Sequence, residues 1–126
     1  MLESYKEDLA IAEKLGDQQR MGSSYCNIGN AYQSEEKYEE ALEYHKKHLA
    51  IVEKLGDQQG IGWAHSNIGL ALDSLGEHQE SLKCYEKSLA IAESLGNQKT
   101  VAGIYCNIGL ACNSLEEYQK ALEYYN

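Results

Sequence analysis

Apolar side chains recur along the chain at steps of three and four residues, which is the spacing of one face of an α-helix. Polar and charged residues occupy most positions between them, so each apolar stripe marks a helix with one buried face. One stripe consists of Ile61, Ala64, His65, Ile68, Ala71, Leu72 and Leu75, and another of Leu42, His45, Leu49, Val52 and Leu55. The pattern predicts about seven helices, at roughly residues 1–15, 18–34, 37–55, 58–75, 78–95, 98–114 and 117–126.

The junctions between these helices carry residues that end one helix and begin the next. A glycine suited to the left-handed conformation that closes a helix stands at Gly16, Gly56 and Gly96. It is followed by a residue that can cap the next helix, namely Asp17, Asp57 or Asn97. The alternate junctions carry acidic residues, which favour the N-terminus of the following helix, at Glu35–Glu36, Gly76–Glu77 and Glu116–Glu117.

Two kinds of helix alternate because the sequence repeats itself at a constant 40-residue offset. LAIAEKLGDQQ, LAIVEKLGDQQ and LAIAESLGNQK begin at Leu9, Leu49 and Leu89, and residues 1–40 share 20 identical positions with residues 41–80. Such a period is typical of stacked helix pairs. We expect one all-α array, an α-solenoid of antiparallel helix pairs, with units at residues 1–17, 18–57, 58–97 and 98–126. Because this array starts and stops inside units, we expect a fragment of a longer one.

The motif within each unit resembles the tetratricopeptide repeat, whose signature is W-x2-L-G-x2-Y followed by A-x3-F. The first half is matched by Tyr25-x2-Ile28-Gly29-x2-Tyr32, His65-x2-Ile68-Gly69-x2-Leu72 and Tyr105-x2-Ile108-Gly109-x2-Cys112. The second half is matched by Met1-x3-Tyr5, Ala41-x3-His45, Ser81-x3-Tyr85 and Ala121-x3-Tyr125. Glycine inside a helix costs up to about 1 kcal/mol relative to alanine. We therefore expect Gly29, Gly69 and Gly109 to mark close contacts between helices.

The unit is longer than the usual 34-residue repeat, and the chain contains no proline. Repeats of this greater length with Leu-Gly-Asp between units resemble the Pins/LGN class of G-protein signalling modulators, and the stretch from Ala41 to Gln59 is especially similar. Kinesin light chains share much of this pattern. The resemblance implies a non-catalytic scaffold that binds an extended peptide segment of a partner protein. The peptide would lie along a concave groove lined by the first helix of each unit.

Mapped onto this sequence, the resemblance places in the groove those residues of the first helices that lie off the apolar stripe. These are Cys26, Asn27, Asn30, Gln33, Trp63, Ser66, Asn67, Leu70, Asp73, Cys106, Asn107, Leu110 and Asn113. Asn27, Asn67 and Asn107 recur in every unit, and a carboxamide can both donate to and accept from a peptide backbone. The alternative is that these asparagines brace neighbouring helices. Because the groove positions carry no Lys or Arg, we expect a neutral or partly apolar peptide.

The charge of the chain narrows the range of partners. It has 20 acidic and 11 basic residues and a formal net charge of −9, which disfavours nucleic acids and anionic membrane surfaces as partners. No stretch is apolar and long enough to span a bilayer. The first residues do not resemble a secretory signal. We therefore expect a cytoplasmic protein.

The sequence contains no pattern typical of catalysis or metal binding. Cys26, Cys84, Cys106 and Cys112 lack the close spacing of a metal site and are expected to be free thiols. His45 and His48 could share a helix face, but a zinc site needs about four ligands. We expect no enzyme activity, no metal and no cofactor. The alternative to a peptide-binding scaffold is a structural spacer, or a solenoid that self-associates through exposed ends.

Overall fold

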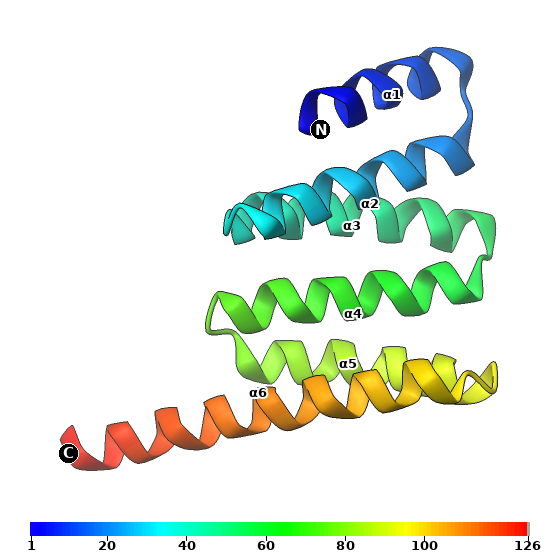
Figure 1. The fold of residues 1–126 in the computed structure, drawn as a ribbon. Coiled ribbons are helices and arrows are strands. Elements are labelled where there is room, and N and C mark those ends of the chain that lie inside the picture. The colour runs from blue at the N-terminus through cyan, green and yellow to red at the C-terminus, as the bar shows by residue number, and fades with distance from the viewer. Residues whose placement is uncertain (126) are drawn as a thin grey trace.

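In the computed structural model, six helices stack side by side in the order of the sequence (Figure 1). The structure describes the backbone of residues 1–125 and the side chains of residues 1–116. The helices are α1 (Leu2–Leu15), α2 (Gln18–Ser34), α3 (Tyr38–Leu55), α4 (Gln58–Ser74), α5 (His78–Ser94) and α6 (Gln98–Tyr125). No strand occurs among the residues whose backbone is described. The predicted all-α solenoid is confirmed.

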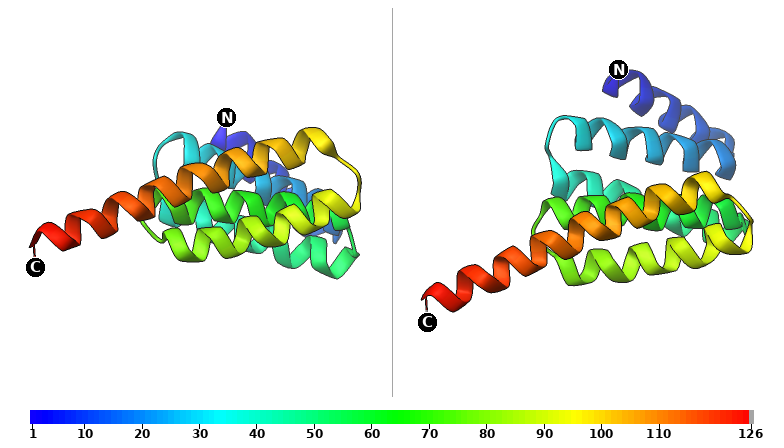
Figure 2. Two further views of the ribbon diagram at one scale, coloured as in Figure 1. Left: turned by 90° about the horizontal axis from the view of Figure 1, so that it is seen from below. Right: turned by 60° about the horizontal axis from the view of Figure 1, so that its bottom comes forward.

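Each helix packs mainly on the helices that precede and follow it in the chain. The pairs α2–α3 and α4–α5 form the two complete repeats, and the contacts α1–α2, α3–α4 and α5–α6 join successive units. The two ends of the chain lie at opposite ends of the stack, and α6 crosses the α4–α5 pair obliquely (Figure 2). The buried apolar side chains are therefore spread along the stack, one small layer for each pair of neighbouring helices.

The junctions between units form as the sequence predicts. Gly16, Gly56 and Gly96 have φ angles of 67°, 66° and 71°, in the left-handed region. The side chains of Asp17 and Asp57 accept hydrogen bonds from the backbone amides of Arg20 and Gly60, at 3.1 and 3.0 Å. Asn97 accepts one from the amide of Thr100 at 3.2 Å. These caps satisfy backbone donors that have no partner inside the helix.

Two of the three motif glycines mark close helix contacts. A Cβ atom added to Gly29 would lie 2.6 Å from the ring of His45, and one added to Gly69 would lie 2.6 Å from the ring of Tyr85. Both rings are almost completely buried. Gly109 differs, because an added Cβ would meet no atom of the described residues within 4 Å. The predicted close contact is therefore confirmed at Gly29 and Gly69 and wrong at Gly109.

The difference at Gly109 follows from the course of α6. We predicted a turn at Glu116–Glu117 and a separate helix over 117–126, which would make seven helices. Instead α6 is one continuous helix of 28 residues, and its distal part extends beyond the stack (Figure 1). Residue 126 lies outside the described residues.

The turns that do form each contain one residue in the left-handed conformation. The two observed turns have a left-handed residue at Glu36, with φ of 62°, and at Gly76, with φ of 84°; Glu116 is the equivalent position. A residue other than glycine in this conformation costs about 1 kcal/mol. At Glu36 the packing of the 18-residue α3 offsets this cost. At Glu116 the backbone instead continues as part of α6, which avoids this cost.

Candidate functional site

The predicted groove residues all lie on α2, α4 and α6, and none of them is fully buried. The exposed members are Asn27, Asn30, Trp63, Leu70, Cys106, Leu110 and Asn113. The half-buried members are Cys26, Gln33, Ser66, Asn67, Asp73 and Asn107. The first helices therefore present a surface on which polar side chains are interspersed with Trp63, Leu70 and Leu110, which are 52%, 38% and 58% exposed.

Two members of the set line a groove at the N-terminal end of this surface. Asn27 and Asn30, with Ala31 and Ser34, form the α2 wall of a groove of about 690 Å³, and α1 forms the opposite wall with residues that include Tyr5. Neither Asn67 nor Asn107 lines this groove. The structure therefore places two of the four first-unit candidates in this groove and leaves Cys26, Gln33 and the candidates of the other units outside it.

Asn67 has a contact that fits the bracing alternative. Its Nδ2 lies 3.9 Å from the Sγ of Cys26, and this hydrogen bond joins α4 to α2. The Nδ2 of Asn30 also donates to the same sulfur, at 3.8 Å. Both bonds to sulfur are weak, so these carboxamides keep acceptor and donor capacity for another partner.

Two other candidates are engaged within the second repeat. The hydroxyl oxygen of Ser66 lies 2.7 Å from that of Ser88, whose hydroxyl also donates to the carbonyl oxygen of Gly62 at 2.8 Å. Ser66 thereby links α4 to α5. The carboxylate of Asp73 forms a short hydrogen bond with Nδ1 of His78, at the start of α5. A basic side chain of a peptide would have to compete with His78 for this carboxylate.

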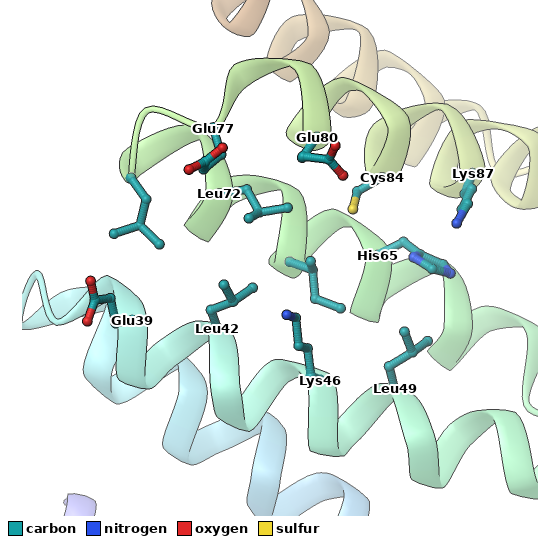
Figure 3. Close-up of a pocket in the computed structure, with 12 residues that line it drawn as sticks. Glu39, Leu42, Lys46, Leu49, His65, Leu72, Glu77, Glu80, Cys84 and Lys87 are labelled. Atoms are coloured by element: carbon teal, nitrogen blue, oxygen red, sulfur yellow. The ribbon is translucent and has the colours of Figure 1, made fainter.

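A second groove, which the sequence analysis did not predict, lies between α3 and α5 over α4 (Figure 3). It has a volume of about 680 Å³. Its apolar residues are Leu42, Leu49, Ile68, Leu72 and Leu75, and its polar residues are Glu39, Lys46, His65, Glu77, Glu80, Cys84 and Lys87. We call it the α3–α5 groove. It shares no residue with the set predicted on the first helices.

Two of the thiols, those of Cys26 and Cys84, are half-buried. Burial raises the pKa of the Cys26 and Cys84 thiols, so both are protonated near neutral pH and are weak nucleophiles. Among residues 1–116, no three His, Cys, Asp or Glu side chains lie close enough together to hold a metal ion. None of the described helices is both long and apolar enough to cross a membrane.

Comparison with protein families gives one match that covers most of the chain. The family model described as "Tetratricopeptide repeat" matches residues 20–94 and, in a second overlapping alignment, residues 60–126. The two alignments are offset by one 40-residue unit. No curated protein matches the chain.

Several solved structures share the fold. BtubC (BKLC) from P. vanneervenii superposes with a TM-score of 0.82 at 20% identity, over 97% of this chain and 51% of that one. A Rap protein complexed with Competence and Sporulation Factor gives 0.75 at 22% identity, over 97% and 36%. Aspartyl phosphate phosphatase F from Bacillus subtilis gives 0.79 at 20%, over 98% and 34%. This chain thus spans about half or less of each similar structure.

Proposed function

Because the chain belongs to the tetratricopeptide repeat family, we propose that it is a protein-interaction scaffold without catalytic activity. In this proposal the first helices α2, α4 and α6 bind an extended peptide segment of a partner protein. The 40-residue unit and the Leu-Gly-Asp junctions favour a scaffold of the Pins/LGN type as the finer assignment.

The observation that carries the proposal is the groove between α1 and α2. Asn27 and Asn30 are exposed along one wall, where two carboxamides offer donors and acceptors at the spacing of one helical turn. A peptide backbone needs both kinds of group, whatever its side chains are. One similar structure is that of a Rap protein complexed with Competence and Sporulation Factor, and binding of a factor there supports a ligand-binding role here.

The expected ligand is neutral or basic and partly apolar. The chain has a net charge of −9, and the groove walls include Glu3 and Glu35 but no Lys or Arg. An acidic peptide would be repelled, while apolar side chains can contact Leu2 and Tyr5.

Replacing both Asn27 and Asn30 with alanine should weaken peptide binding about tenfold, because each lost hydrogen bond contributes about 0.5–1.5 kcal/mol. Binding can be measured by fluorescence anisotropy with peptides selected on an array by the unaltered chain. Gln19→Ala is the matched control, since Gln19 is an exposed carboxamide on the same helix and lies outside the groove. Equal affinity of the double variant and the control for every selected peptide would contradict the groove assignment.

Self-association through the ends of the stack is a second candidate, favoured by two uncovered stripes. The exposed residues of α6 include Ala102, Tyr105, Cys106, Gly109 and Cys112. In the preceding unit, Gly62 and Gly69 occupy the positions of Ala102 and Gly109, and both are buried under α5. On α1, Tyr5 and Ile11 occupy the positions of Tyr85 and Ile91, which cover those glycines. The α1 helix of one copy could therefore cover α6 of another. Such a contact would be head-to-tail and open-ended.

A disulfide between copies tests this contact. Asp8 and Cys106 are equivalent to Ser88 and Ser66, whose hydroxyl oxygens are 2.7 Å apart. Mild oxidation of Asp8→Cys should therefore give a ladder of linked copies on a non-reducing gel, and the digest should contain peptides that join the introduced thiol to Cys106. Glu7→Cys, one residue away on another face of α1, serves as the control and should give no such ladder. A strictly monomeric chain at high concentration in light scattering would rule the contact out.

A further inference from the structure

Three tyrosine rings, two from α2 and one from α3, form a cluster beside Lys6 of α1. The ring centroids of Tyr32 and Tyr44 are 5.6 Å apart with the rings stacked, and those of Tyr25 and Tyr44 are 6.2 Å apart. Two lysines lie over this cluster. The Nζ of Lys6 is 5.6 Å from the centroid of Tyr32, and the Nζ of Lys47 is 4.8 Å from that of Tyr44. These distances are typical of cation–π contacts.

One unit later, the same positions hold smaller side chains. His65, Leu72 and Cys84 are the equivalents of Tyr25, Tyr32 and Tyr44 in the next repeat, and all three line the α3–α5 groove. The two cations are retained, because Lys46 and Lys87 are the equivalents of Lys6 and Lys47 and also line the groove. The α3–α5 groove is thus the position of the tyrosine cluster with the rings removed and the lysines kept.

We propose that the α3–α5 groove binds aromatic side chains supplied by a peptide segment of a partner protein. The rings take the space that Tyr25, Tyr32 and Tyr44 fill in the preceding unit, against Leu42, Ile68 and Leu72 of the groove. Lys46 and Lys87 contact the faces of these rings. In Figure 3 Lys46 extends from α3 into the groove, and Cys84 and Lys87 extend from α5 towards it.

The charged residues of the groove indicate which way round the ligand binds. Glu39, Glu77 and Glu80 lie at the end formed by the starts of α3 and α5, whereas Lys87 and His65 lie at the other end (Figure 3). A basic residue beside the aromatic residues would meet these carboxylates. The partner segment therefore combines two aromatic side chains with a Lys or Arg, and this site is independent of the groove at Asn27 and Asn30.

The first experiment uses p-cresol, the side chain of tyrosine, as the probe and NMR of the labelled chain as the readout. Titration should shift the ε-methylene proton signals of Lys46 and Lys87 upfield in a saturable way, because these protons lie over the ring face. The aliphatic analogue 4-methylcyclohexanol should bind at least fivefold more weakly. Equal binding of the two probes would identify a merely apolar groove and overturn the proposal, as would the absence of saturable shifts.

Two variants locate the site. Changing His65, Leu72 and Cys84 together to tyrosine should abolish p-cresol binding by filling the groove, and the same trio already packs together in the preceding unit. Should this variant fail to fold, Lys46→Gln with Lys87→Gln provides a milder test, since both lysines are exposed. This pair should lower p-cresol affinity at least fivefold, whereas Lys54→Gln on α3, outside the groove, should not. Unchanged affinity in the lysine pair would overturn the proposal.

The same titration separates this site from the groove on the first helices. The variant with Asn27→Ala and Asn30→Ala should retain the full p-cresol response, because neither residue lines the α3–α5 groove. A peptide array extends the test to the complete ligand. Each peptide contains two aromatic residues and one lysine, and each is paired with a version in which alanine replaces the aromatic residues. Only the peptides that keep their aromatic residues should bind. The variant in which three tyrosines fill the α3–α5 groove should bind none of them.

Discussion

Lowering the pH from 7.5 to 4 should remove about 3 kcal/mol of the free energy of unfolding through His45 alone. Burial, with a smaller contribution from His48, lowers the pKa of His45 to about 4 from the usual 6.5. Between these two values the unfolded chain binds a proton at His45 that the folded chain does not. Stability is therefore full above about pH 6.5 and falls as the pH drops towards 4. Burial also lowers the pKa of His48, and the negative charge of Asp57 offsets part of this shift. The lowered pKa of His48 likewise makes the folded chain less stable as the pH falls.

His45→Phe isolates this contribution. Tyr85 shows that a six-membered ring fits against the equivalent glycine, and the Nδ1 of His45 has no hydrogen-bond partner among the described residues. The variant should therefore be at least as stable as the parent at pH 7.5. Urea unfolding followed by circular dichroism at both pH values gives the loss for each protein. Carboxylate titration is common to both, so the parent should lose about 3 kcal/mol more than the variant. An equal loss in the two proteins would contradict the attribution of this pH dependence to His45.

Alanine at Gly69 should lower the free energy of unfolding by about 1–2 kcal/mol, while alanine at Gly109 should raise it by up to about 1 kcal/mol. The new methyl group at Gly69 would lie 2.6 Å from Cε1 and 2.9 Å from Cδ1 of the fully buried Tyr85 ring. That overlap outweighs the better helix propensity of alanine. At Gly109 no atom of the described residues lies within 4 Å of the new methyl group, so only the gain in helix propensity remains.

Urea unfolding of the two single variants and the parent tests this contrast. The two glycines share one motif position, so each variant is the control for the other. A destabilising alanine at Gly109 would mean that a helix covers this face in solution. Such a result would contradict an uncovered α6 face, and it would favour either the predicted turn at Glu116–Glu117 or a second copy.

Much of the fold could be predicted because the signals are local and repeated. The left-handed glycines at Gly16, Gly56 and Gly96 and the caps at Asp17 and Asp57 depend only on a few adjacent residues. The end of α6 could not be predicted in this way. Glu36 and Glu116 are the same residue type at the same position of the repeat, yet Glu36 forms a left-handed turn and Glu116 lies inside α6, so the residue at the turn does not by itself decide where a helix ends.

The candidate site was harder to predict than the fold. A resemblance selects positions on the first helices, but it does not show that Ser66 is bonded to Ser88 or that Asp73 is bonded to His78. The α3–α5 groove was missed for a different reason. The groove arises where equivalent positions of two units differ, as at Tyr44 and Cys84. A repeat pattern, in contrast, consists of the residues that the units share.

The linear order of the helices places the single tryptophan of the sequence in one unit only. Trp63 lies on α4, whereas the cluster of Tyr25, Tyr32 and Tyr44 belongs to α2 and α3 of the preceding unit. Since each helix packs mainly on its sequence neighbours, neighbouring units can lose structure at different denaturant concentrations. Emission from Trp63 then reports on one unit, whereas emission from the ten tyrosines, five on each side of Trp63 in the sequence, reports on the whole chain. A gap between the two transition curves measures how strongly adjacent units are coupled.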